Sequence, residues 1–245
     1  MEEFVPTRID GLDPLLGGGI PKGSLVLIAG TPGTMKSTLC YTAMYHNAVH
    51  GEKGLYISLE QDGEHLRKSM ARLGMEDNGD NRVYILDLST IRKELADREA
   101  KKNWTRMLVD IARQAVQEDR YTMLTIDSLE AFYALASFEN PRRELFHFFN
   151  EMKELGVTTF FITEVPIGSK VLTRYGEDFL VDGVVFLQHV EVGETDVQLR
   201  LRIVKMRNTG HQTGWFAVHH DGQRFLVSQI LSRRRRPHGE ADETE

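Results

Sequence analysis

The stretch "SLVLIAGTPGTMKSTLCYTAMYHNAV" covers residues 24–49 and reads as a buried strand, a glycine-containing turn and a helix, in that order. Within it, residues 30–37 match the phosphate-binding pattern G-x-x-x-x-G-K-[ST] at every fixed position except one. Gly30 begins the match, and Lys36 and Ser37 end it. Met35 stands where the second glycine belongs. A strand before the turn and a helix after it would point backbone N–H groups and the helix N-terminus at a bound phosphate. We therefore predict a nucleotide-binding loop, called here the phosphate loop, formed by Gly30, Thr31, Pro32, Gly33, Thr34, Met35, Lys36, Ser37 and Thr38. The alternative is a tight strand-to-helix turn without a ligand.

Met35 allows two interpretations. If its backbone is helical, a methionine costs little there, and its N–H still donates to phosphate while the unbranched side chain curls away. If the position needs a positive φ, the substitution stores on the order of 1–3 kcal/mol of strain. The sharper part of the turn still has a glycine, Gly33, and glycine adopts a positive φ without strain. We expect nucleotide binding to survive and leave the catalytic rate open.

The rest of the chain alternates short apolar runs with segments of helical character. The runs are apolar on both faces, which is typical of parallel strands covered by helices. This alternation predicts an α/β fold with a mostly parallel central sheet flanked by helices. The expected strands are 24–30, 54–60, 82–88, 121–127, 157–164 and 182–190, and the expected helices are 36–50, 62–74, 103–118 and 140–155. Residues 195–208 predict an antiparallel or edge strand, and residues 214–227 predict a hairpin that turns at Asp221-Gly222.

Composition limits the class of protein. The chain has 245 residues, 27% of them charged, and a net charge of −6, which argues against a protein whose main role is to wrap nucleic acid. A single cysteine, Cys40, excludes an intramolecular disulfide and fits a reducing compartment. No run approaches the roughly 18 apolar residues of a membrane span, and the acidic N-terminus lacks the pattern of a signal peptide. We expect a cytoplasmic protein that does not bind membranes. Residues 1–230 are expected to form one domain and residues 231–245 a charged, disordered tail.

Two acidic residues end predicted strands. Asp127 follows the strand in "YTMLTIDS" and is placed to hold Mg²⁺ together with Ser37. Glu60 ends "GLYISLE" and is placed to orient an attacking water, because the carboxyl ends of parallel strands meet at one edge of a sheet. The alternative for each carboxylate is a cap on the helix that follows it. Lys36 would reach the β- and γ-phosphates.

Three further polar residues lie near the same predicted edge. Gln61 can hydrogen-bond a water but cannot take its proton. Thr163 and Glu164 end the strand in "VTTFFITE" and are weaker candidates for a switch that senses the γ-phosphate.

Several motifs together resemble one family. These are "TRIDGLDPLLGGGIPKGSLVLIAGTPG", "YISLEQDGEHL", "EDFLVDGVVFL" and "LRIVKMRNTGH", which occur in order and span almost the whole chain. In this respect the chain resembles KaiC-like ATPases of the RecA superfamily, a group that includes many archaeal single-domain proteins. The resemblance implies a RecA-like core that binds Mg·ATP and hydrolyses it. It also implies a homo-oligomer, for which a hexameric ring is one candidate form, with nucleotide bound at the boundary between subunits.

The resemblance also implies roles for single residues. Glu60 matches the first of two adjacent glutamates in the family, the water-activating one, whereas Gln61 replaces the second. Lys205 and Arg207 match a basic finger that reaches a neighbouring subunit's γ-phosphate, and His211 belongs to the same signature. Without the resemblance, "RLRIVKMR" reads as the solvated polar face of an edge strand. Asp178 and Phe179 stand where clock proteins of the family carry phosphoacceptors, so autophosphorylation is not expected there.

Three functional hypotheses follow. The first is a regulatory or signalling ATPase that acts on a protein partner of unknown identity. The second is a nucleotide sensor with little or no hydrolysis, which Met35 and Gln61 favour. The third is a recombination mediator that binds DNA, for which the sequence offers only the arginine run 233–236, followed by acidic residues.

Overall fold

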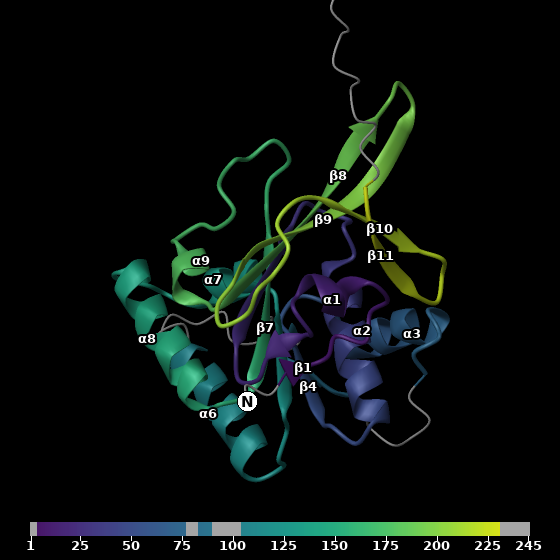
Figure 1. Cartoon of the computed structure of the whole chain (residues 1–245). Coiled ribbons are helices and arrows are strands. Elements are labelled where there is room, and N and C mark those ends of the chain that lie inside the picture. The colour runs from purple at the N-terminus through teal and green to yellow at the C-terminus, as the bar shows by residue number, and fades with distance from the viewer. Residues whose placement is uncertain (1–3, 77–82, 90–103, 231–245) are drawn as a thin grey trace, which may run out of the picture.

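The computed structural model describes residues 4–76, 83–89 and 104–230 (Figure 1). The predicted tail, residues 231–245, and its arginine run lie outside the described residues, as do residue 82 of one predicted strand and residue 103 of one predicted helix.

Nine strands of the described residues form one sheet, in the order β11-β10-β9-β8-β3-β7-β6-β4-β5. Six of them are parallel: β3 (Leu25–Gly30), β4 (Gly54–Ser58), β5 (Val83–Asp87), β6 (Met123–Asp127), β7 (Thr158–Glu164) and β8 (Gly183–Val192). Strand β3 lies between β7 and β8 and carries the phosphate loop at its carboxyl end. The register pairs Gly30 with Glu164 and Ser58 with Asp127, so the predicted site residues emerge at one edge of the sheet.

Helices cover both faces of the sheet (Figure 1). On one face, α2 (Lys36–Val49) and α3 (Gly63–Arg72) pack in the same core cluster as Val26 and Ile28. On the other face, α6 (Trp104–Gln117), α7 (Leu129–Leu135) and α8 (Pro141–Glu154) pack with Leu25 and Leu27. Neighbouring residues of β3 thus enter opposite cores, because side chains alternate across a strand. The predicted α/β fold is confirmed.

The carboxyl-terminal strands are antiparallel, as predicted. Strand β9 (Asp196–Met206) pairs with β8, and β10 (Phe216–His220) and β11 (Phe225–Gln229) form a hairpin. The Asp221 carboxylate accepts hydrogen bonds from the backbone N–H groups of Gln223 and Arg224, each 2.8 Å long, and Gly222 has a φ of 102°. These contacts place the turn at the predicted Asp221-Gly222.

Short elements without a periodic pattern were not predicted. They are β1 (Phe4–Val5), α1 (Leu12–Leu15), β2 (Ile20–Pro21) and α9 (Glu177–Leu180). The amino-terminal segment lies against β11, where a Cβ on Gly11 would come within 2.0 Å of the Val227 carbonyl oxygen. Gly11 also has a φ of 80°, so both the space and the backbone require glycine.

None of the described helices is long and apolar enough to cross a membrane.

Candidate functional site

A pocket of about 590 Å³ opens at the carboxyl edge of the parallel strands. It is lined by residues of the phosphate loop, by two residues that follow β4, by the end of β6 and its successor, and by two residues of β7: Gly33, Thr34, Met35, Lys36, Ser37, Thr38, Glu60, Gln61, Asp127, Ser128, Ile162 and Glu164. Gly30, Thr31 and Pro32 do not line it; they form the turn that leads into it. The structure thus brings together the residues predicted from four separate segments.

The first turn of the phosphate loop is tightly closed. A Cβ on Gly30 would lie 2.7 Å from both the Leu187 carbonyl oxygen and the Thr34 hydroxyl. Thr34 Oγ1 donates a 2.7 Å hydrogen bond to the Thr31 carbonyl. Glycine at position 30 is therefore required by the packing of the loop against β8.

Met35 adopts a left-handed conformation, with φ of 61° and ψ of 30°. Of the two interpretations of this residue, the helical one is wrong and the strained one holds. The left-handed region costs an L-residue roughly 1–2 kcal/mol relative to glycine. The Met35 side chain packs partly against the core beside α2, which offsets part of that cost.

Lys36 is folded back onto its own loop. Its Nζ donates to the carbonyl oxygens of Gly30, at 3.1 Å, and Thr31, at 3.2 Å, and lies 3.8 Å from Glu164 Oε1. The side chain is only 8% exposed, so these acceptors compensate a buried ammonium. The lysine is held at the pocket wall with its donors aimed at oxygen atoms.

Asp127 is a buried carboxylate held by two hydroxyl groups. Its Oδ2 accepts hydrogen bonds from Ser37 Oγ, at 2.7 Å, and from Tyr56 Oη, at 2.5 Å. Burial raises the pKa of Asp127, and these two hydrogen bonds oppose the rise. Burial and the neighbouring Asp127 also raise the pKa of Tyr56 well above its usual value, so its hydroxyl stays a donor. The helix-cap alternative for Asp127 is wrong, because Ser128 is the N-cap of α7 and accepts from the backbone N–H of Ala131.

Glu60 is exposed at the mouth of the pocket. Its Oε2 accepts a 3.0 Å hydrogen bond from Ser128 Oγ, which orients the carboxylate beside Asp127. The helix-cap alternative is wrong here too, since Asp62 caps α3 by accepting from the backbone N–H of His65.

The two weaker candidates from β7 differ in environment. Thr163 is buried and donates a 2.6 Å hydrogen bond to Glu130 Oε1, whose pKa burial raises. It does not line the pocket. Glu164 does line it, and its carboxylate faces the Lys36 ammonium.

The predicted finger residues lie away from this pocket. Lys205 pairs with Val184 across β9 and β8, near the amino end of β3, whereas the phosphate loop follows the carboxyl end. Lys205 Nζ donates to the carbonyl oxygens of Asp178, at 2.9 Å, and Val181, at 2.6 Å. Burial, and then the neighbouring Arg207, lower the pKa of Lys205. The lysine is therefore anchored at α9 and is not part of a freely solvated face.

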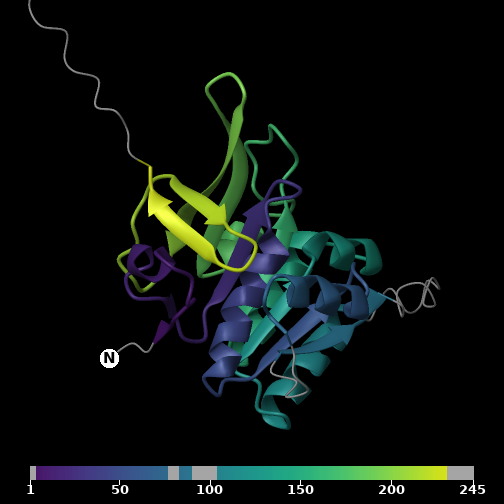
Figure 2. The ribbon, with the colours of Figure 1, turned by 90° about the vertical axis from the view of Figure 1, so that its right-hand side faces the viewer.

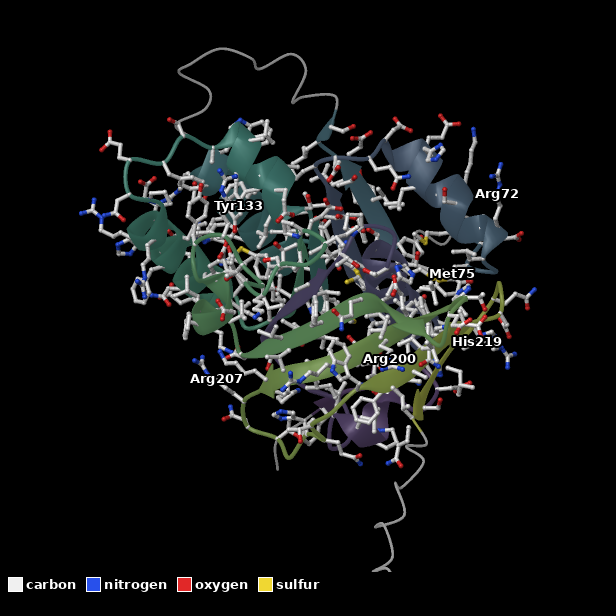
Figure 3. The ribbon with its side chains drawn as sticks, turned by 90° about the horizontal axis from the view of Figure 1, so that it is seen from above. Arg72, Met75, Tyr133, Arg200, Arg207 and His219 are labelled. Atoms are coloured by element: carbon white, nitrogen blue, oxygen red, sulfur yellow. The ribbon has the colours of Figure 1, made fainter. Side chains whose placement is uncertain are left out.

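Arg207 lies on the outer side of the molecule, near the turn that follows β9 (Figure 3). It donates a 3.3 Å hydrogen bond to the Phe179 carbonyl and is half exposed. In the part of the chain that the structure describes, the buried Nδ1 of His211 has no hydrogen-bond partner.

Sequence reasoning missed Tyr56 and Ser128, whose hydroxyl groups hold Asp127 and Glu60. Tyr56 looks like one more aromatic residue of a buried strand, and no motif marks it. Ser128 directly follows Asp127, which was the one available signal.

Comparison with known proteins gives a consistent picture. A family model described as "ATPase: KaiC" matches residues 5–221. The circadian clock oscillator protein KaiC of Thermostichus vulcanus is 30% identical over 219 residues, which are 86% of this chain and 41% of that protein. The chain thus spans about two fifths of the length of such clock relatives.

Shorter relatives match along most of their length. A UPF0273 protein of Thermotoga maritima is 29% identical over 221 residues, covering 86% of this chain and 90% of that protein. A crystal structure of a KaiC-like protein from the hyperthermophilic archaeon Pyrococcus horikoshii superposes with a TM-score of 0.78 at 28% identity. The match covers 93% of this chain and 99% of that one.

The left-handed backbone at Met35 predicts a difference between two substitutions. Met35→Gly and Met35→Ala both remove the thioether side chain, but only glycine adopts a positive φ without strain. We expect the free energy of unfolding of the glycine variant to exceed that of the alanine variant by about 1 kcal/mol. Chemical denaturation of the two variants in parallel measures this difference. An alanine variant as stable as the glycine variant would contradict the left-handed conformation.

Proposed function

Because the chain belongs to the KaiC family of ATPases, we propose that it binds Mg·ATP in the pocket at the phosphate loop and hydrolyses it. We further propose that a neighbouring subunit completes the site and that the protein acts as a regulatory or signalling ATPase. The observation that carries this proposal is that one pocket holds Lys36, the Ser37–Asp127 pair and Glu60. These are a phosphate-binding cation, two oxygen ligands and an exposed carboxylate.

The Ser37–Asp127 pair fits a magnesium ion. Mg²⁺ prefers oxygen ligands and is usually held by one or two side chains, substrate phosphates and several waters. Ser37 Oγ and Asp127 Oδ2 are 2.7 Å apart and point at each other. The Ser37 hydroxyl and the Asp127 carboxylate would hold the ion, and its charge would offset the negative charge of the β- and γ-phosphates.

Glu60 suits the role of orienting the attacking water. It is exposed to solvent inside the pocket mouth, and Ser128 fixes one of its two carboxylate oxygens. The other oxygen is available to accept a hydrogen bond from water. Gln61 lines the pocket beside it and can position a water without taking its proton.

A neighbouring subunit would supply the remaining positive charge. Among the described residues, Lys36 is the one lysine or arginine that lines the pocket, whereas phosphoryl transfer gains from a further cation at the γ-phosphate. Lys205 and Arg207 lie on the far side of β8 from the phosphate loop. They can therefore serve only the pocket of another copy, in a homo-oligomer such as a ring. We propose that residues 1–230 act as one domain, in support of which one sheet joins strands from residue 25 to residue 229.

A second candidate function is a nucleotide sensor that barely hydrolyses ATP. The strained Met35 and the glutamine at position 61 favour it. The experiment on Glu60 below separates the two functions.

Replacing the water-orienting carboxylate separates binding from hydrolysis. We expect Glu60→Gln to keep the ATP affinity within about twofold while phosphate release falls by about 100-fold or more, because the amide cannot accept a proton. ATP binding and Mg²⁺-dependent phosphate release are measured at protein concentrations that permit assembly. The control is Lys36→Ala, which is expected to lose binding. Wild-type protein that binds ATP at micromolar concentration but releases no more phosphate than the control would reject the ATPase in favour of the sensor.

The hydrogen bond from Tyr56 predicts a pH dependence of magnesium binding. Mg²⁺ needs the ionised form of Asp127, and Tyr56 lowers the pKa of that carboxyl. Tyr56→Phe should therefore raise the pKa of Asp127. As the pH is lowered, the variant should lose Mg²⁺-dependent binding of a non-hydrolysable ATP analogue at a higher pH than the wild type does. Analogue affinity is measured against pH at saturating Mg²⁺.

The matched control for this experiment is Tyr45→Phe, since the Tyr45 hydroxyl donates to the Glu76 carbonyl and not to Asp127. We expect its pH profile to follow the wild type. A Tyr56→Phe profile that also coincides with the wild type would show that Asp127 is not the group that titrates.

A further inference from the structure

A second pocket lies between α2 and the β10–β11 hairpin, whose turn lies next to α2 in Figure 2. Its volume is about 220 Å³, and none of its lining residues lines the nucleotide pocket. Three basic side chains from separate segments line it: Arg8 from the amino-terminal segment, His46 from α2 and Arg224, which directly precedes β11. Asp10 and the buried Phe225 also line it, together with Ile9 and Thr42.

Arg8 is held in place by specific contacts. Its Nε donates a 3.2 Å hydrogen bond to Asn47 Oδ1, and Asn47 Nδ2 in turn donates to the Pro6 and Ala43 carbonyls, at 2.7 and 2.8 Å. The Arg8 backbone has a φ of 56°, and its N–H donates to Asp13 Oδ2 at 3.1 Å. A residue other than glycine rarely adopts this conformation, and such strained residues often lie in ligand clamps.

One carboxylate, that of Asp10, lines the pocket beside the three basic groups. Within residues 4–76, 83–89 and 104–230, the structure records no ion pair for Arg8, His46 or Arg224. Burial is the largest cause that lowers the pKa of His46, and Arg8, His50 and Arg224 lower it further, whereas Asp10 raises it. The two guanidinium groups thus disfavour the protonated form of the His46 ring, and an anion bound between them would favour that form.

We propose that this pocket, called here the Arg8–Arg224 pocket, binds a small phosphate monoester that carries hydroxyl groups. Arginine guanidinium groups match the oxygen geometry of phosphate and bind it with paired hydrogen bonds. Asp10 gives the rest of the ligand a hydroxyl acceptor, and Phe225 gives it an apolar surface. The volume, less than half that of the nucleotide pocket, suits a sugar phosphate and not a nucleoside triphosphate.

The test follows the His46 ring by nuclear magnetic resonance, because that signal reports this pocket and not the phosphate loop. The ring resonance is assigned with His46→Gln, and ribose 5-phosphate, inorganic phosphate and ribose are titrated separately. We expect ribose 5-phosphate to shift the His46 resonance to saturation and to raise the pKa of His46. Inorganic phosphate should bind more weakly at the same place, and ribose should cause no shift.

Three variants separate this site from other causes. Arg224→Gln removes one charged hydrogen-bonding group and should lower the affinity for ribose 5-phosphate by about tenfold or more. Arg142→Gln, on the exposed start of α8 across the sheet, should bind as the wild type does. Lys36→Ala should also keep the affinity, since the phosphate loop is not involved. The proposal is overturned if ribose 5-phosphate leaves the His46 resonance unmoved, if Arg224→Gln binds as tightly as Arg142→Gln, or if inorganic phosphate binds as tightly as the ester.

Discussion

The hydrogen bond from Ser37 Oγ to Asp127 Oδ2, 2.7 Å long, joins the phosphate loop to the end of β6. The two residues are 90 positions apart in the chain, and β7 lies between β3 and β6 in the sheet. Their contact requires the parallel strands to end at one level, which the register provides. Leaving a buried carboxylate without partners would cost several kcal/mol, and the hydrogen bonds from Tyr56 and Ser37 compensate this cost at Asp127. The remaining site residues are arranged around this pair.

Local sequence predicted the fold well because strands buried on both faces must be apolar throughout, and each expected strand fell on an observed one. Asp127 and Glu60 could be found because strand ends converge. The conformation of Met35 could not, since its φ depends on how the whole loop closes against β8. The contacts of Tyr56 and Ser128 also depend on side chains brought together from different strands, which no spacing in the sequence encodes. The sequence analysis likewise did not identify Asp62 as the residue that caps α3.

The position of Lys205 and Arg207 follows from the same sheet. Strand β9 is antiparallel, so it carries these residues back toward the amino end of β3, away from their own phosphate loop. The carbonyl groups of α9 and its end hold both side chains there. In our proposal, the nucleotide binds at the phosphate loop of one copy, and Lys205 and Arg207 of a neighbouring copy supply the further cations. The site is thus divided between two copies of the chain.

Complementation between two inactive variants tests this division most directly. Lys36→Ala keeps the finger but disables the phosphate loop, and Lys205→Ala does the reverse. If a subunit boundary combines the loop of one copy with the finger of the next, each variant alone is inactive. When the two variants are co-expressed in equal amounts, about one subunit boundary in four would combine an intact loop with an intact finger. The mixture would then hydrolyse ATP at roughly a quarter of the wild-type rate. A co-expressed mixture no more active than the separate variants, beside an active wild type, would contradict the account.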